Sequence, residues 1–88
     1  MTRVVVYVQA GCPACHEYTP RIRAAARKYR VALDVVHLDT RSGAAMATKH
    51  RIRVTPTTDF FSERDTVTRR TGNLPDAALE RLLAIRET

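Results

Sequence analysis

The stretch from Arg3 to Cys15, RVVVYVQAGCPAC, decides the fold. Its beginning, RVVVYV, is apolar on both faces of a pleated strand, which is typical of a strand buried in the middle of a sheet. The turn-like Gly11-Cys12-Pro13 follows, and apolar residues then recur at helical spacing from about residue 13 to 29. We therefore predict a central strand that leads directly into an amphipathic helix, with Pro20 as the cause of a kink in that helix.

The rest of the chain continues the alternation of strands and helices. Residues 32 to 38 (ALDVVHL) are a second predicted strand, which makes a parallel crossover unit with the first strand and helix. The remaining predicted elements are a helix over 42–50, a hairpin of strands 57–61 and 66–70, and a closing helix that begins near Pro75. We expect one α/β domain over residues 1–88, ordered β-α-β-α-β-β-α, with a four-stranded mixed sheet flanked by three helices.

Composition limits the class of protein. The 88 residues are 44% hydrophobic and 27% charged with 3 Gly and 4 Pro, which fits one small globular domain and excludes collagen-like, mucin-like and disordered chains. The longest apolar run, Val4 to Val8, is far shorter than the ~18 residues of a membrane span, and no secretory signal is apparent. We expect a cytoplasmic protein that does not bind membranes.

The charge is basic, with 15 Lys and Arg against 9 Asp and Glu. The basic residues are spread along the chain, and the aromatic residues are not interleaved with them as a base-stacking surface requires. We therefore expect the basic surface to favour solubility or to attract acidic partner proteins, and we do not expect specific nucleic-acid recognition.

The chemistry of the chain centres on its two cysteines, in Cys12-Pro13-Ala14-Cys15. A thiol at a helix N-terminus faces unpaired N–H groups and the positive end of the helix dipole, which favour the thiolate. Cys12 is therefore the candidate nucleophile. Cys15 lies about one helical turn further on the same side and is more shielded, so we assign it the role of resolving thiol.

Three other uses of this cysteine pair were weighed. A zinc site needs four ligands, and the remaining His16, His37 and His50 lack ligand spacing. The string from Cys12 to His16 matches the C-x-x-C-H pattern of haem c attachment, but it follows a buried strand in a chain without an apparent export signal. A purely structural disulfide would close too short a loop to restrain the unfolded chain much. We expect no metal and no cofactor.

Beyond the cysteines, the sequence resembles the thioredoxin family over nearly its whole length. The segments that carry the resemblance, in thioredoxin order, are the GCPAC loop (11–15), Pro20, Tyr29, IRVTPT (52–57) and TGNLP (71–75). The chain looks like a minimal form of the family, of glutaredoxin-like length. The resemblance implies a thioredoxin fold in which Thr55-Pro56 is a cis peptide beside the cysteines.

The resemblance also implies a function and a substrate site. It implies a thiol-disulfide oxidoreductase that reduces protein disulfides through Cys12 and Cys15, with a thioredoxin reductase or glutathione as electron donor; we expect a monomer. The implied substrate groove is formed by the cysteine loop and by the backbone around the cis proline, which pairs with an extended substrate segment. Its residues are Gly11, Pro13, Ala14, Val54, Thr55, Pro56 and Gly72.

The chain departs from the family pattern at several positions. Val6 takes the place of the buried thioredoxin aspartate, and His37 takes the place of the lysine beside that aspartate. His37 is therefore a candidate to accept the proton of Cys15, directly or through a water. The alternative is that His37 is an ordinary, partly buried strand residue that packs against its neighbours. The loop looks more like the GCPxC of glutaredoxins, but Ala14 replaces their aromatic residue and their glutathione motif is absent. Two alternatives therefore stay open: a glutathione-dependent reductase, and a thioredoxin-shaped binding subunit with incidental thiols.

Overall fold

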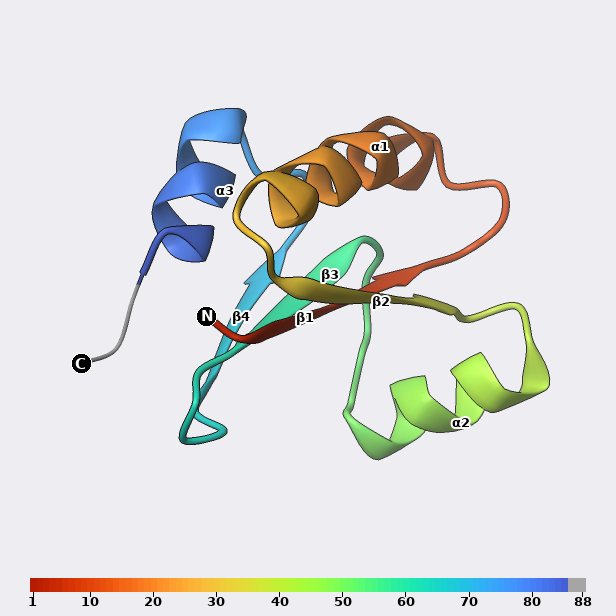
Figure 1. The fold of residues 1–88 in the computed structure, drawn as a ribbon. Helices are drawn as coiled ribbons and strands as arrows, with labels where there is room; N and C mark the ends of the chain where they lie inside the picture. Colours follow the sequence, from red (N-terminus) through yellow and green to blue (C-terminus); the bar gives the residue numbers. More distant parts are fainter. Residues whose placement is uncertain (86–88) are drawn as a thin grey trace.

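The computed structural model describes residues 1–85 and confirms the predicted order of elements (Figure 1). The elements are β1 (Arg3–Val8), α1 (Pro13–Lys28), β2 (Ala32–His37), α2 (Arg41–Lys49), β3 (Thr57–Phe61), β4 (Val67–Thr71) and α3 (Asp76–Leu83). The four strands form one sheet in the order β2-β1-β3-β4, in which β1 runs parallel to β2 and antiparallel to β3. The mixed sheet and its interior first strand are as the sequence predicts.

The helices cover the two faces of the sheet unequally. Figure 1 shows α1 and α3 on one face and α2 on the other. The main core lies between the sheet and the α1–α3 pair, because alternate residues of β1 point that way and meet the apolar stripes of both helices. Its fully or almost fully buried members include Val4, Val6, Tyr18, Ile22, Phe60 and Leu79. Burial of each such side chain contributes about 1.5–3 kcal/mol, so this layer holds α1 firmly on the sheet.

Helix α2 lies close against the end of β2 on the other face. A Cβ added at Gly43 would stand 1.7 Å from the His37 carbonyl oxygen, so only glycine permits this approach. The N-cap of α2 adds to the same junction, because the Thr40 hydroxyl accepts a hydrogen bond from the Gly43 N–H at 3.0 Å and donates one to the His37 carbonyl at 2.8 Å. These contacts fix where the chain turns after β2.

An ion pair between a buried carboxylate and an exposed arginine joins β3 to β4. Asp59 on β3 is 2% exposed, and Arg69 on β4 donates to both of its carboxylate oxygens at 2.6 and 2.8 Å. Asp59 and Arg69 are cross-strand partners, so the sheet register itself brings them together. Among the described residues, no helix is both long and apolar enough to span a bilayer.

Candidate active site

The cysteine pair sits at the N-terminus of α1, as the sequence predicts. Gly11 has a φ of +75°, which turns the chain out of β1, and Cys12 then adopts an extended conformation as the N-cap residue with Pro13 in the first turn. The Cys12 Sγ accepts a hydrogen bond from the Cys15 N–H at 3.1 Å. This donor would also stabilise a thiolate at Cys12, which is the physical basis of a reactive first cysteine.

The two sulfurs are joined in a disulfide, with their Cα atoms 5.2 Å apart. Their surroundings differ as predicted. Cys12 is half-buried at the surface, whereas Cys15 is only 3% exposed and belongs to the main core. An incoming disulfide can therefore reach Cys12 more easily than Cys15.

A second segment, far away in sequence, lies against Cys12. The Thr55-Pro56 peptide is cis, which confirms the expectation from the family resemblance. The carbonyl oxygen and the hydroxyl oxygen of Thr55 lie 3.8 and 3.7 Å from the Cys12 Sγ. Since the sulfur carries no hydrogen in the disulfide, the hydroxyl is the donor in the oxidised protein, and a reduced Cys12 can donate to the carbonyl.

The segment before Pro56 is open to a partner. Val54 is 51% exposed although it is apolar. In the described part of the chain, the backbone N–H groups of residues 53, 54 and 55 have no hydrogen-bond acceptor. Exposed and unpaired backbone groups of this kind can pair with an added extended segment.

A third segment lies beside Pro56. The Gly72 N–H donates to the Pro56 carbonyl at 2.7 Å, and Gly72 has a φ of +78°, so it lies beside the proline as expected. Pro13 and Ala14 are exposed on the cysteine loop. The structure therefore brings the predicted substrate-binding residues from three segments to one end of the sheet.

One buried hydrogen bond holds these segments in place. The hydroxyl groups of Tyr18 on α1 and Thr58 on β3 lie 3.0 Å apart, and both residues are fully buried. Tyr18 lies three residues after Cys15, and Thr58 lies two residues after Pro56. This bond therefore ties the helix that carries the cysteines to the strand that follows the proline.

Beneath the cysteine loop, the family's buried carboxylate is replaced by an apolar residue. Val6 is fully buried and pairs in register with Val35, whereas His37 pairs with Val8. His37 lies two residues further along β2 than Val35, on the same face of the sheet. It is also exposed, because β2 is an edge strand and ends at this residue.

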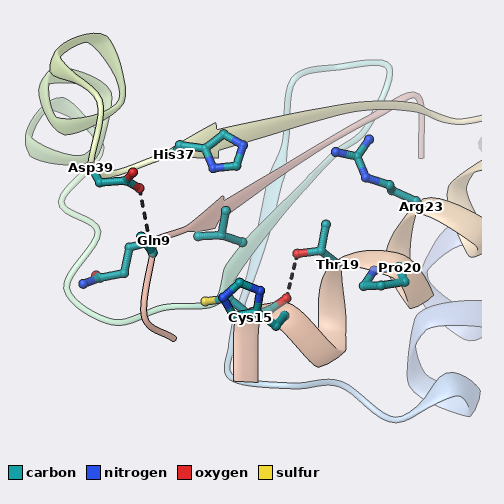
Figure 2. A pocket seen from close by; sticks show the side chains of 10 residues that line it. Gln9, Cys15, Thr19, Pro20, Arg23, His37 and Asp39 are labelled. Carbon is teal, nitrogen blue, oxygen red and sulfur yellow. Dashed lines mark hydrogen bonds between the residues drawn. The ribbon is translucent and has the colours of Figure 1, made fainter. Parts of the chain in front are cut away.

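His37 instead lines a cavity of about 470 Å³ together with Cys15. Figure 2 shows that Cys15, Thr19, Pro20 and Arg23 enter it from α1, whereas His37 and Asp39 come from the opposite wall. Asp39 accepts a hydrogen bond from the Ala10 N–H at 3.3 Å, which joins the ends of β1 and β2. The imidazole of His37 and the shielded cysteine therefore line the same cavity.

Part of this cavity is formed by residues that the sequence does not single out. Gln9, His16, Arg23 and Asp39 also line it, but they were not predicted as site residues. His16 had a signal, since it directly follows Cys15, whereas Asp39 is brought near only by the pairing of β1 with β2. No group of three or more His, Cys, Asp or Glu side chains within residues 1–85 is arranged to hold a metal ion.

A charged network includes Asn73, which directly follows Gly72. Arg21 donates to Glu17 at 2.7 and 3.0 Å and to Asp76 at 2.9 Å, and Asn73 donates to Glu17 at 2.6 Å. These hydrogen bonds, above all those from Arg21, hold the pKa of Glu17 below its ordinary value. The network connects α1 with the loop that leads into α3.

The fold and the site can now be compared with known proteins. The model of the thioredoxin family matches residues 1–85. The chain belongs to the thioredoxin family. Family membership and the bonded Cys12–Cys15 pair support thiol-disulfide oxidoreductase chemistry in general. No curated protein matches the sequence of this thioredoxin-family chain.

Solved thioredoxins have the same fold at low sequence identity. Thioredoxin 1 from the thermophilic eubacterium Thermosipho africanus superposes with a TM-score of 0.81 at 12% identity, over 93% of this chain and 90% of that chain. Thioredoxin O2 from Arabidopsis thaliana superposes with a TM-score of 0.80 at 22% identity, over 92% and 70%. Fasciola hepatica thioredoxin gives 0.77 at 24% identity, over 92% and 76%. These similarities concern the fold.

Proposed function

We propose that this protein reduces disulfide bonds of protein substrates by dithiol exchange. The observation that carries the proposal is the position of Cys12, half-buried at the α1 N-terminus and within 4 Å of Thr55, in a segment with unpaired backbone donors. An extended substrate that pairs with residues 53 to 55 lies beside Cys12, so pairing and chemistry use the same surface.

The reaction has two exchange steps. The Cys12 thiolate attacks one sulfur of the substrate disulfide, which breaks that bond, forms a mixed disulfide and releases the other substrate sulfur as a thiolate that takes a proton from water. Cys15 then loses its proton and attacks the Cys12 sulfur, which releases the second substrate thiolate. Two electrons pass from the dithiol to the substrate, and the product is the Cys12–Cys15 disulfide.

The second step needs an acceptor for the Cys15 proton. Val6 stands where the family has a carboxylate, but its hydrocarbon side chain has no group that can accept a proton. We propose that His37 takes this role through water in the cavity that it shares with Cys15. The water provides the path, since His37 pairs with Val8 and not with Val6.

The oxidised protein must be reduced before each new turnover. We propose a thioredoxin reductase or glutathione as the electron donor, and we propose that the protein acts as a monomer in the cytoplasm. The cytoplasm suits this direction of electron flow, because its thiol pools keep most dithiols reduced.

Insulin reduction tests the proposal. With dithiothreitol as donor, the protein should accelerate precipitation of the insulin B chain, whereas Cys12→Ser should not. Absence of turnover by a correctly folded wild-type protein would favour a thioredoxin-shaped binding subunit. Replacing dithiothreitol by NADPH with thioredoxin reductase, or by glutathione with glutathione reductase, identifies the donor.

A further inference from the structure

One border of the proposed substrate groove is unusually basic. From Thr40 to Thr58 the chain contains no Asp or Glu but four Lys and Arg, namely Arg41, Lys49, Arg51 and Arg53. Arg53 directly precedes Val54 and Arg51 lies two residues earlier, so both come shortly before Thr55, which contacts Cys12. The basic border is defined here as Arg51 and Arg53.

Both residues of the basic border are available to a partner. Arg51 and Arg53 are exposed, and neither forms an ion pair or a side-chain hydrogen bond with any residue in the described range 1–85. Other arginines of the chain are engaged: Arg21 with Glu17 and Asp76, and Arg69 with Asp59. The positive charge of the basic border is therefore not neutralised within the described structure.

The other side of the groove has a different balance of charge. Beyond Gly72, the side chains of Glu17 and Asp76 share the single guanidinium of Arg21. Both carboxylates are more than half exposed, at 55% and 75%. The side before Pro56 thus carries two guanidinium groups without carboxylate partners, whereas the side after it carries two exposed carboxylates together with Arg21 and Arg70, so a bound segment meets different potentials on the two sides of its cysteine.

We propose that the basic border selects substrates with acidic residues on one side of the reactive cysteine. This inference rests on the proposed function. A segment paired with residues 53 to 55 advances ~3.3 Å per residue, so its positions about two to four residues from the cysteine lie beside Arg53 and Arg51. Carboxylates there meet two unpaired guanidinium groups, which bind carboxylates well, whereas lysines there meet like charge.

Matched disulfide peptides test this inference. Four peptides contain the same disulfide and differ in the residues that flank the cysteine. The first has three Glu before the cysteine and the second has three Glu after it. The third has three Gln on both sides, and the fourth has three Lys on both sides. The reduction rate kcat/KM is measured with dithiothreitol as donor at low salt, for the wild type, Arg53→Gln and the double variant Arg51→Gln/Arg53→Gln. The readout is the ratio of the Glu to the Gln rate within each protein, so a general change in activity cancels.

The control variant is Arg27→Gln/Arg30→Gln. It removes the same charge at the far end of α1, about 20 Å from Cys12 along the helix. It also matches the backbone, because Arg30 and Arg51 have φ of 56° and 57°. If the net charge of +6 alone attracts acidic peptides, the control and the double variant will lower the ratio equally.

The expected result is a ratio of roughly three to ten for one of the two Glu peptides in the wild type and in the control. The ratio should fall toward one in the double variant and in 1 M salt, where the screening length is about 3 Å. Equal rates for the Glu, Gln and Lys peptides would overturn the inference, as would an equal loss in the control. If the wild type reduces neither the Gln peptide nor the small neutral compound hydroxyethyl disulfide, the proposed function itself fails.

Discussion

The buried bond between Tyr18 and Thr58 allows a quantitative test of how the site is held together. The two hydroxyl groups are 3.0 Å apart, come from positions 40 residues apart and belong to fully buried residues. Thr58→Val keeps the shape of the side chain but leaves the Tyr18 hydroxyl buried without this partner, which costs about 1–3 kcal/mol of unfolding free energy. Tyr18→Phe likewise leaves the Thr58 hydroxyl buried without this partner and should cost a similar amount of unfolding free energy.

The double variant is the informative one. Replacing both partners removes the unsatisfied hydroxyl, so its loss should be well below the sum of the two single losses, with a coupling energy of about 1–2 kcal/mol. The total stability of a chain of 88 residues is roughly 4–13 kcal/mol, so each single loss is measurable. Urea unfolding of the oxidised proteins, followed by circular dichroism, gives the four free energies.

A control substitution separates the bond from the chemistry of Thr→Val. Thr71 lies on β4 and is exposed, so Thr71→Val should change stability by less than about 0.5 kcal/mol. If the Tyr18 and Thr58 losses add with a coupling below about 0.5 kcal/mol, the bond does not hold α1 to β3. Apolar packing alone would then hold α1 to the sheet.

Three further predictions follow from the site and its surroundings. Cys15→Ser should accumulate mixed disulfides with substrates through Cys12, whereas Cys12→Ser should accumulate none; mass spectrometry of trapped adducts checks this, and adducts on Cys15 would reverse the assignment. His37→Gln should slow insulin reduction several-fold near pH 7 and change its pH profile, and an unchanged profile would leave bulk water or substrate as the proton acceptor. Burial raises the pKa of Tyr7 and of Tyr18 above 10.0, so the stability that each contributes is complete below about pH 10 and is lost as pH rises through the raised pKa. The urea concentration at the midpoint of unfolding should therefore decrease as the pH rises above 10, and it should decrease less in Tyr18→Phe than in the wild type. An equal decrease in the wild type and in Tyr18→Phe would contradict this.

The order of elements and the place of the cysteines could be predicted from the sequence. A buried strand and an amphipathic helix each depend on residues within a few positions of each other. The run RVVVYV predicts the strand, and the helical periodicity that follows it predicts the helix. The predicted bounds differ from the observed ones by no more than about one residue. The role of Cys12 as N-cap residue follows from the same local pattern, since Gly11 and Pro13 mark the junction.

The position of Pro56 needed more than local pattern. Proline alone does not determine a cis peptide, and the expectation at Thr55-Pro56 came from the resemblance to thioredoxins. The contact of Thr55 with Cys12 spans 43 positions and depends on the antiparallel pairing of β1 with β3. The same holds for the basic border: its charges are visible in the sequence, but only the tertiary structure places Thr55, which follows shortly after them, against Cys12.

Only the tertiary structure decided which side chains surround Cys15. The register of β1 and β2 sets His37 beside Val8 and not beside Val6, and it brings Asp39 to the Ala10 N–H. If β2 were shifted by two residues relative to β1, every side chain would stay on the same face of the sheet. The hydrophobic pattern therefore does not distinguish a pairing of His37 with Val8 from one with Val6. Local pattern therefore determines the face of the sheet on which His37 lies. The residue of β1 with which it pairs depends on loop lengths and on the close contact of Gly43 with the end of β2.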